Sequence, residues 1–321
     1  MYIAVICGGL SAERDVSISS GTGAARALRA RGHKVALVDL FLGNPSAVND
    51  PRSVFTSDVG DSVYSVRETE PDLDKIRAQR GGKGLIGPGV IEICRAADIA
   101  FLALHGAEGE NGKLQACLDL YGVPYTGSGY LGSALAMDKE LSKILFRSSG
   151  IPTPPGVTLH RGDAVPESIG FPCVVKPCSG GSSVGTSIVT EPEKLPGALE
   201  EAFSCDEAVL VEKYIRAREL TVGVMDGRAM AVIEIIPKTG FYDYKNKYQA
   251  GLTEEICPAP ISAEDTERVQ RLAERVYEAL HLDAYGRVDF LMDKADGELY
   301  CLEANTLPGM TPASLIPKAA K

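Results

Sequence analysis

Strands and helices alternate in the first third of the chain, and this alternation restricts the fold more than any other feature of the sequence. Apolar runs at Tyr2–Cys7, Lys34–Leu40 and Ile99–Leu104 are typical of buried strands. The segments Ser17–Arg31 and Gly112–Leu120 have the spacing of helices. Strands that alternate with helices predict a parallel sheet covered by helices, as in α/β proteins.

Two strands of this predicted sheet end at glycines. Gly8-Gly9 follows the first strand, and His105-Gly106 follows the third. Ligands of open α/β sheets bind at the carboxyl ends of the strands. These two turns are therefore candidate binding positions.

The charge of the chain excludes one class of partner. The 321 residues include 33 Lys and Arg against 43 Asp and Glu, which gives a formal net charge of −10. Binding to a phosphate backbone needs a basic face, so we expect no nucleic-acid partner. A local basic pocket can still bind a small anion. No apolar run reaches the roughly 20 residues that cross a bilayer, so we also expect no membrane partner.

The eight cysteines indicate a reducing compartment. None form a C-x-x-C pair, and several lie in apolar, strand-like runs. We interpret them as reduced, mostly buried thiols of a cytoplasmic protein. A zinc site or a cysteine nucleophile is the alternative.

The segment Gly127–Gly132 matches the dinucleotide-binding pattern G-x-G-x-x-G literally. The strand expected before it, Val123–Thr126, is short, and no acidic residue ends a following strand about 20 residues on, as a true site would require. We therefore reject a dinucleotide site and the oxidoreductase that it would imply.

The loop that follows Lys176 is a stronger candidate for binding phosphate. A strand over Pro172–Lys176 delivers the lysine to a Gly/Ser-rich loop that ends at Gly185. Glycines let backbone N–H groups approach phosphate oxygens, and the lysine adds positive charge. Lys139, in a helix predicted over Ala134–Arg147, is a second candidate contact. The alternatives are a mobile hairpin loop without a ligand and a solvated helix lysine.

A predicted hairpin between Arg287 and Asn305 brings acidic side chains together. If the turn centres on Asp296, Asp289 faces Glu303 and Arg287 faces Asn305, because side chains alternate along strands. Neighbouring carboxylates repel unless a cation lies between them, and oxygen ligands suit Mg²⁺. A salt-bridged strand pair is the alternative. The apolar residues expected on the opposite, buried face are Val288, Phe290, Leu302 and Ala304.

Other polar groups extend this possible site. Gly309 follows the hairpin, where its N–H is suited to bind an oxyanion, and Ser314 starts the last helix, where a carboxylate is favoured. Glu212 ends a strand and is suited to read an adenine amino group, while Glu219 is suited to hold a ribose; both can equally be surface acids. The Tyr- and Lys-rich segment 241–248 predicts a lid, or a disordered loop.

Taken in order, these segments resemble the D-alanine–D-alanine ligases of the ATP-grasp superfamily. The similarity covers nearly the whole chain and includes the runs Gly8–Ser17, Met137–Lys139, Gly286–Asp289 and Leu302–Thr311. The resemblance implies an α/β fold with an α+β C-terminal part, in which an ATP-grasp fold follows a Rossmann-like domain. It implies three domains: 1–128, 129–212 and 213–321.

The resemblance also implies a reaction. ATP phosphorylates the carboxylate of one D-alanine, and the amine of a second displaces phosphate to form D-alanyl-D-alanine for peptidoglycan. Joining two anions requires cations, and an acyl phosphate must be kept from water. The implied cofactors are ATP and two Mg²⁺ ions, for which Mn²⁺ would substitute; activation by K⁺ stays open.

Roles carry over to the matching positions. Glu13 would bind the first ammonium and form a hydrogen-bonded triad with Ser182 and Tyr248. Arg287 and the Gly309 N–H would stabilise the oxyanion. The implied substrate-binding residues are Glu13, His105, Lys247, Arg287, Gly309 and Ser314. The implied ATP-binding residues are Lys139, Lys176, Ser182, Ser183, Glu212, Tyr214, Ile215, Glu219 and Lys247, and the implied metal ligands are Asp289, Glu303 and Asn305.

Three alternatives stay open at this point. A sibling ligase would use D-serine as second substrate, because a pocket rejects an added hydroxyl only weakly. D-lactate is less favoured, since Tyr248 lies in an intact Tyr-Lys segment. The same fold would also allow a non-catalytic ATP-binding protein. The resemblance further implies a bacterial, cytoplasmic homodimer, and a natural chain that continues beyond Lys321.

Overall fold

The structure is a computed structural model, and it describes residues 1–59, 64, 66, 71–81, 84–181, 183–238, 253–311 and 314–320. The chain divides into two compact units. Unit 1 contains residues 1–134, 283–285 and 306–321, and unit 2 contains residues 135–282 and 286–305. The division into three domains at residues 128 and 212 stays a prediction.

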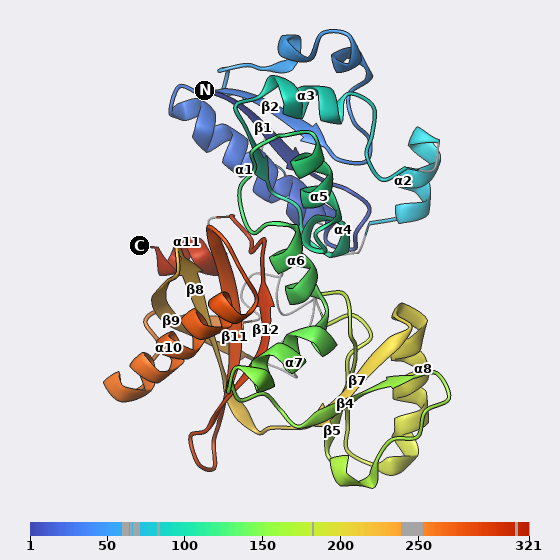
Figure 1. The fold of residues 1–321 in the computed structure, drawn as a ribbon, viewed down its shortest axis with the longest axis vertical. Helices are drawn as coiled ribbons and strands as arrows, with labels where there is room; N and C mark the ends of the chain where they lie inside the picture. Colours follow the sequence, from blue (N-terminus) through green and yellow to red (C-terminus); the bar gives the residue numbers. More distant parts are fainter. Residues whose placement is uncertain are drawn as a thin grey trace. The chain divides into compact units, whose positions relative to one another are not determined.

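Unit 1 is built on the predicted parallel sheet (Figure 1). Its strand order is β2-β1-β3, with β1 at Tyr2–Cys7, β2 at Lys34–Asp39 and β3 at Ile99–Leu102. The helix α1 (Arg14–Ala30) packs against β1 and β2. A second apolar cluster joins the other side chains of these strands to α3 (Val90–Ala96) and α5 (Lys113–Leu120). Helices therefore cover both faces of the sheet. Polar residues are left to the turns that follow the strands.

The predicted helix over Ala134–Arg147 is two helices. They are α6, at Tyr130–Met137, and α7, at Lys139–Ser148. Between them Asp138 has an extended backbone, and its carboxylate accepts a hydrogen bond from the Leu141 N–H at 3.0 Å. An aspartate at this position caps a new helix rather than continuing the old one. The cap places Lys139 in the first turn of α7.

Unit 2 contains two antiparallel sheets. The four-stranded sheet has the order β4-β7-β5-β6, and α8 (Leu195–Cys205) packs on its β5 and β7 strands. Apolar side chains of α8, including Ala198 and Ala202, form a cluster with the buried side chains of the strands. The bounds of the strands are β4 Gly156–His160, β5 Cys173–Pro177, β6 Ser187–Val189 and β7 Ala208–Lys213.

The five-stranded sheet has the order β10-β9-β8-β11-β12, and α10 (Ala263–Ala279) lies along it (Figure 1). Buried side chains of α10, including Val269 and Val276, pack with Val288 and Phe290 of β11 in the largest apolar cluster. β10 pairs with β9 in antiparallel register, with Thr253 opposite Pro237 and Ile256 opposite Glu234. The strands are β8 Ala217–Met225, β9 Arg228–Pro237, β10 Thr253–Ile256, β11 Tyr285–Asp293 and β12 Leu299–Asn305. The remaining elements are η1 Pro45–Val48, η2 Pro51–Val54, α2 Leu73–Arg80, α4 Ala107–Glu110, α6 Tyr130–Met137, α7 Lys139–Ser148, η3 Glu167–Ile169, η4 Pro192–Lys194 and α11 Leu315–Ala319.

The hairpin of β11 and β12 has the predicted register at its polar end. Arg287 pairs with Asn305, and Asp289 pairs with Glu303. The next pair is Phe290 with Cys301, so β12 carries one extra residue there, a β-bulge. The extra residue is Leu302. The prediction that Leu302 lies on the buried face with Phe290 is wrong, because Leu302 is only half-buried and lies outside the apolar cluster that contains Val288, Phe290 and Ala304.

All eight cysteines are free thiols, and five of them are buried, which fits the interpretation of reduced thiols. Burial raises the pKa of Cys7 to about 12 and that of Cys178 to about 11. These thiols therefore stay protonated at neutral pH and are poor nucleophiles. Among the described residues, no helix combines the length and the apolar character needed to cross a bilayer.

The largest apolar cluster gives a test of the core. Ile151 is 1% exposed within it, whereas Ile144 is 46% exposed on α7. We expect Ile151→Val to lower the free energy of unfolding by about 1 kcal/mol, because one buried methyl group is lost. Ile144→Val removes the same group from a solvated position. Urea unfolding followed by fluorescence checks this, and equal midpoints for the two variants would contradict the assigned core.

Candidate functional site

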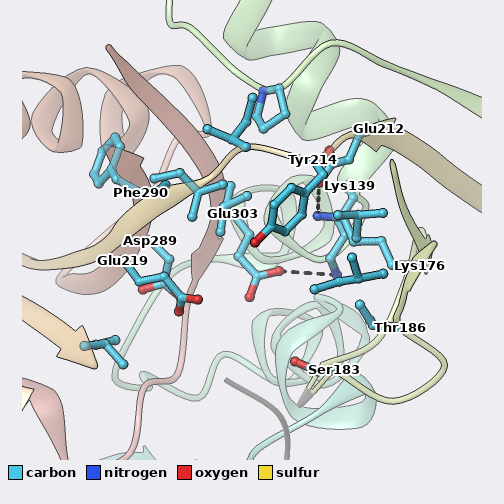
Figure 2. A pocket seen from close by; sticks show the side chains of 18 of the residues that line it. Lys139, Lys176, Ser183, Thr186, Glu212, Tyr214, Glu219, Asp289, Phe290 and Glu303 are labelled. Atoms are coloured by element: carbon cyan, nitrogen blue, oxygen red, sulfur yellow. Dashed lines mark hydrogen bonds and ion pairs between the residues drawn. The ribbon is translucent and has the colours of Figure 1, made fainter. Parts of the chain in front are cut away.

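Unit 2 encloses a cavity of about 740 Å³ between elements of both its sheets (Figure 2). It is lined by β5, β7, β8, β9, β11, β12, the Gly/Ser-rich loop and the start of α7. Nine of the residues singled out from the sequence lie in its wall. They are Lys139, Lys176, Ser183, Glu212, Tyr214, Ile215, Glu219, Asp289 and Glu303.

Glu212 lies in the wall of this cavity as a buried carboxylate between two lysines. Its Oε1 lies 2.6 Å from Nζ of Lys176, and its Oε2 lies 2.8 Å from Nζ of Lys143. The side chain is 2% exposed. On the neighbouring strand β4 stands Gly156, where a Cβ would lie 2.7 Å from the Cβ of Glu212. The glycine leaves the space that the carboxylate needs.

Glu212, Lys176 and Lys143 shift one another's pKa values. Burial would raise the pKa of Glu212, but attraction to Lys176 and Lys143 outweighs it and lowers that pKa. Burial would lower the pKa of Lys176, yet Glu212 and Glu303 raise it. Burial lowers the pKa of Lys143, and the attraction of Glu212 only opposes this shift. Glu212 is therefore an ionised carboxylate, which accepts hydrogen bonds and donates none.

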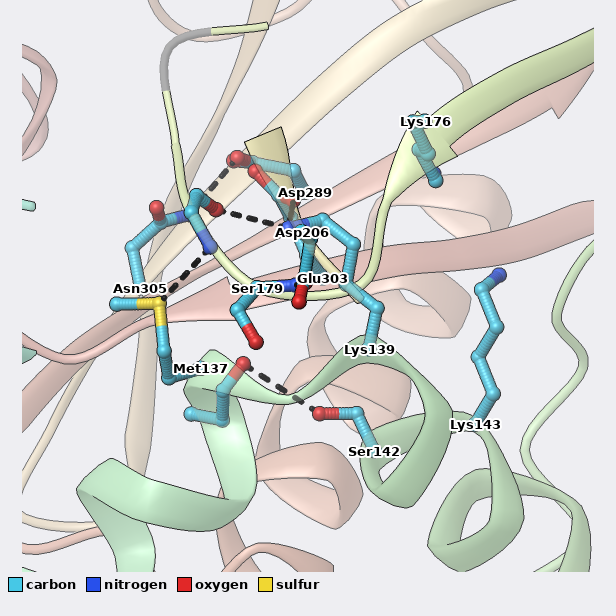
Figure 3. Close-up of polar contacts among 12 residues, drawn as sticks. Met137, Lys139, Ser142, Lys143, Lys176, Ser179, Asp206, Asp289, Glu303 and Asn305 are labelled. Atoms are coloured by element: carbon cyan, nitrogen blue, oxygen red, sulfur yellow. Dashed lines mark hydrogen bonds and ion pairs between the residues drawn. The ribbon is translucent and has the colours of Figure 1, made fainter. Parts of the chain in front are cut away.

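Lys139 connects the start of α7 to the rest of the cavity. Its ammonium lies 3.5 Å from Oε2 of Glu303 and donates to the carbonyl of Gly180 in the Gly/Ser-rich loop at 2.9 Å. The N–H of Lys139 donates to the carbonyl of Cys178, and the N–H of Gly180 contacts Sδ of Met137 (Figure 3). The described part of the loop is thus held against α7, with two lysines available to an anion in the cavity.

Asp289 is the centre of a polar network on β11. Arg287 binds it in bidentate fashion, with Nε and Nη2 each 2.9 Å from a carboxylate oxygen. The amide of Asn305 donates to Oδ2 at 3.0 Å, and the hydroxyl of Thr221 donates to Oδ1 at 2.6 Å. The network orients the carboxylate, because a bidentate guanidinium fixes its plane.

The polar residues at this part of the hairpin of β11 and β12 fit a divalent cation. Asp289 and Glu303 are direct cross-strand neighbours, and both line the cavity. Residues opposite one another on antiparallel strands have Cβ atoms about 5 Å apart. Within the described residues, no three His, Cys, Asp or Glu side chains form a group suited to a metal, so Asn305 would supply the third protein donor. Two carboxylates and an amide oxygen suit Mg²⁺ rather than a metal that prefers nitrogen or sulfur.

His105 lies at the carboxyl end of β3 in unit 1, as predicted, and is buried. Its Nδ1 lies 2.9 Å from the carbonyl of Leu307, and its Nε2 lies 3.0 Å from the hydroxyl of Ser20. A carbonyl only accepts, so Nδ1 carries a proton and donates it to Leu307. Glu13 immediately precedes α1, and a Cβ at Gly106 would lie 3.2 Å from its carboxylate. Unit 1 therefore brings the predicted residues Glu13 and His105 to neighbouring turns.

Gly309 and Ser314 also lie close together in unit 1. The hydroxyl of Ser314 accepts from the N–H of Thr311 at 3.1 Å, although Ser314 directly precedes α11. A Cβ at Gly309 would lie 2.6 Å from that hydroxyl oxygen. Only glycine fits at position 309 without displacing Ser314.

Three predicted residues fall outside the described part of the chain: Ser182, Lys247 and Tyr248. The predicted lid at 241–248 lies outside it as well. The rejected glycine motif has a packing role in unit 1, since a Cβ at Gly127 would lie 2.9 Å from Cδ2 of Leu307.

The structure adds two residues that the sequence analysis missed, Lys143 and Thr221. Both are buried, and each contacts a predicted site residue. The spacing of Lys143 four residues after Lys139 was a usable signal, because residues at this spacing share one helix face. Figure 3 shows both lysines on α7. Thr221 had no comparable signal, because a threonine in an apolar strand is ordinary.

Comparisons with known proteins agree with one another. Residues 2–128 match the family described as D-ala D-ala ligase N-terminus, and residues 145–321 match D-ala D-ala ligase C-terminus. The D-alanine--D-alanine ligase of Pediococcus pentosaceus is 44% identical over 100% of this chain and 93% of its own length.

Two solved structures are also similar. The D-alanine--D-Alanine ligase of Bacillus anthracis complexed with ATP has a TM-score of 0.73 at 32% identity, over 100% of this chain and 91% of that chain. The VanG D-Ala:D-Ser ligase of Enterococcus faecalis has a TM-score of 0.71 at 29% identity, over 99% and 93%.

Proposed function

Because the chain belongs to the D-alanine–D-alanine ligase family, with the α/β ATP-grasp architecture of that family, we propose that it joins two D-alanine molecules at the expense of ATP. ADP and inorganic phosphate are the other products of the proposed reaction. The observation that carries this proposal is the cavity of unit 2. Its wall holds both the Glu212 cluster and the cross-strand carboxylates Asp289 and Glu303.

The Glu212 cluster suits the nucleoside of ATP. An ionised carboxylate accepts from the 6-amino group of adenine, and the backbone at Tyr214 and Ile215 lies in the same wall. Glu219 on β8 is placed to accept from ribose hydroxyls. Lys139 and Lys176 supply positive charge for the phosphates, with donors from the Gly/Ser-rich loop that include Ser183. Ser182 and Lys247 are proposed for the same role on the family motif alone.

The polar residues of the hairpin of β11 and β12 suit the metal ions that accompany ATP. Asp289, Glu303 and Asn305 would hold Mg²⁺, or Mn²⁺ in its place. Such an ion neutralises charge on the transferred phosphoryl group. Arg287 keeps Asp289 oriented, while Lys139 balances the charge of Glu303.

The proposed chemistry has two steps. A carboxylate oxygen of the first D-alanine attacks the γ-phosphorus of ATP, and ADP leaves. The amine nitrogen of the second D-alanine then attacks the carbonyl carbon of the acyl phosphate; phosphate leaves and the nitrogen loses a proton. Arg287 and the Gly309 N–H are proposed to stabilise the tetrahedral oxyanion. Glu13, His105 and Ser314 are proposed for the substrates, and Ser182, Lys247 and Tyr248 complete the proposed set.

The choice of second substrate favours D-alanine. The Pediococcus relative with the D-alanine name is 44% identical to the chain, whereas the solved D-Ala:D-Ser ligase is 29% identical. A non-catalytic ATP-binding protein is disfavoured, because such a protein would have no need of Asp289 and Glu303 in register beside Arg287. We further propose a homodimer, on the family alone, and a cytoplasmic location, where ATP is present and free thiols persist.

The test is ATP-dependent phosphate release with D-alanine, D-serine and D-lactate, offered singly and in pairs. We expect phosphate release with D-alanine alone, matched one to one by D-alanyl-D-alanine in the chromatogram. A dominant mixed product from D-alanine with D-serine would replace the second substrate. Release that does not depend on any amino acid would mean an ATPase, and the Asp289→Asn variant controls for a contaminating one. No release with any pair would refute the ligase activity.

A further inference from the structure

Lys143 is a buried cation that the proposed reaction does not use. Its side chain is 2% exposed, and its ammonium contacts Oε2 of Glu212 at 2.8 Å and the hydroxyl of Thr153 at 2.6 Å. That hydroxyl donates in turn to the carbonyl of Cys301 on β12 at 2.9 Å. Burying a lysine is costly unless its charge is paired and hydrogen-bonded. Lys143 meets both conditions, and its position is fixed from two sides.

The carboxylate of Glu212 has two lysine partners with different surroundings. Lys176 and Glu212 both line the cavity, whereas Lys143 approaches Glu212 from within α7. A nucleotide in the cavity competes for Lys176, because the phosphates of ATP are anions and Lys176 is their proposed partner. Lys143 does not reach the phosphates, because it is buried and its ammonium is bound to Thr153. It remains the partner of Glu212 while ATP is bound.

We propose that Lys143 is a positioning residue that keeps Glu212 ionised and directed into the cavity, so that the site selects a 6-amino purine over a 6-oxo purine. This inference rests on the proposed function of the cavity as the ATP site. An ionised carboxylate accepts from the 6-amino group of adenine. The 6-oxo group of hypoxanthine is itself an acceptor, so it faces Glu212 without a shared proton. Two acceptors that face each other without a proton between them repel, and this repulsion disfavours the wrong base.

The proposal is tested by comparing ATP with ITP, which differ at the base and share the ribose and the triphosphate. Dissociation constants are measured by titration calorimetry with Mg²⁺, and kcat/KM for each nucleotide is measured with D-alanine. Any effect of a variant on Lys176 and the phosphates is common to both nucleotides and cancels in the ratio. The wild-type protein is expected to bind ATP more tightly than ITP.

The decisive variant is Lys143→Met, which keeps the unbranched side chain as far as its fourth atom and removes the ammonium group. We expect its ATP:ITP preference to fall by about tenfold or more, equivalent to the loss of one charge-assisted contact. The matched control is Ser142→Ala, on the same helix and equally buried, whose hydroxyl bonds to the carbonyl of Leu135 instead. It removes a buried polar contact without touching Glu212, so its preference should equal that of the wild type.

Two further variants keep the proposal falsifiable. If Lys143→Met does not fold, Lys143→Gln retains a hydrogen-bond donor without the charge and is measured in the same way. Lys143→Arg restores the charge and should recover most of the preference. An uncharged variant with the same ratio as Ser142→Ala overturns the inference, as does a wild type without preference. A wild type that binds no ATP refutes instead the proposed function of the cavity.

Discussion

Replacing Asp289 with asparagine is expected to lower kcat for D-alanyl-D-alanine formation on the order of 10³-fold, with the fold retained. The substitution preserves the shape of the side chain and removes its charge. It weakens the proposed metal site and removes the carboxylate charge that Arg287 now binds through two hydrogen bonds. Steady-state ADP release at saturating ATP and Mg²⁺ gives kcat, and Mn²⁺ titration followed by electron paramagnetic resonance reports the metal site independently of turnover.

The chain offers a matched control on the same strand. Asp293 also lies on β11, but its carboxylate accepts from the N–H of Ala295 in the hairpin turn. Asp293→Asn should leave kcat and Mn²⁺ affinity unchanged. Glu303→Gln, across the hairpin from Asp289, should behave like Asp289→Asn. Near-normal turnover in either Asp289→Asn or Glu303→Gln would remove that residue from the metal site.

Replacing Arg287 with lysine is expected to lower kcat on the order of 10²-fold. Lysine keeps the charge but has one compact ammonium group, so it cannot bind both oxygens of Asp289 as the planar guanidinium does. The orientation of Asp289 and the proposed oxyanion contact are lost together. The measurement is kcat with D-alanine at saturating ATP, together with the dissociation constant for ATP, which should change little.

Arg218 provides the comparison for this substitution. It binds Glu234 in the same bidentate way, with Nε and Nη2 at 2.6 and 2.7 Å from the carboxylate oxygens. Arg218→Lys should lower the melting temperature without a comparable loss of kcat. Because Arg218 lines the same cavity, both variants are assayed at saturating ATP, and an equal loss of kcat there would mean that Arg287 has no special role in the reaction.

The polar end of the hairpin could be predicted because two simple rules suffice there. Side chains alternate along a strand, and the position of the turn sets which residues face each other. The pairs Arg287 with Asn305 and Asp289 with Glu303 follow directly and are confirmed. The parallel sheet of unit 1 was predictable for a similar reason, since each of its strands is a short apolar run followed by a turn.

The missed features depend on packing between segments that are distant in the sequence. Nothing near Lys143 in the chain indicates that Glu212, on another element, lies beside its ammonium. Thr221 meets Asp289 only because β8 and β11 are neighbours in the sheet. The bulge at Leu302 depends on how β12 fits its partner strand, which the alternation of residue types does not encode. The break at Asp138 was readable in principle, because aspartate before a charged helical turn is a common cap.

The bulge in β12 has a consequence for what a single strand can offer to a ligand. In a regular strand, consecutive side chains leave opposite faces, so like-facing positions are about 7 Å apart. Leu302 and Glu303 are consecutive, and both line the cavity. An apolar side chain and a carboxylate therefore lie side by side on one strand beside the cavity. This combination suits a molecule such as ATP, which has a flat apolar base and anionic phosphates. Deleting Leu302 would remove only the apolar part of this surface and would leave Asp289 opposite Glu303.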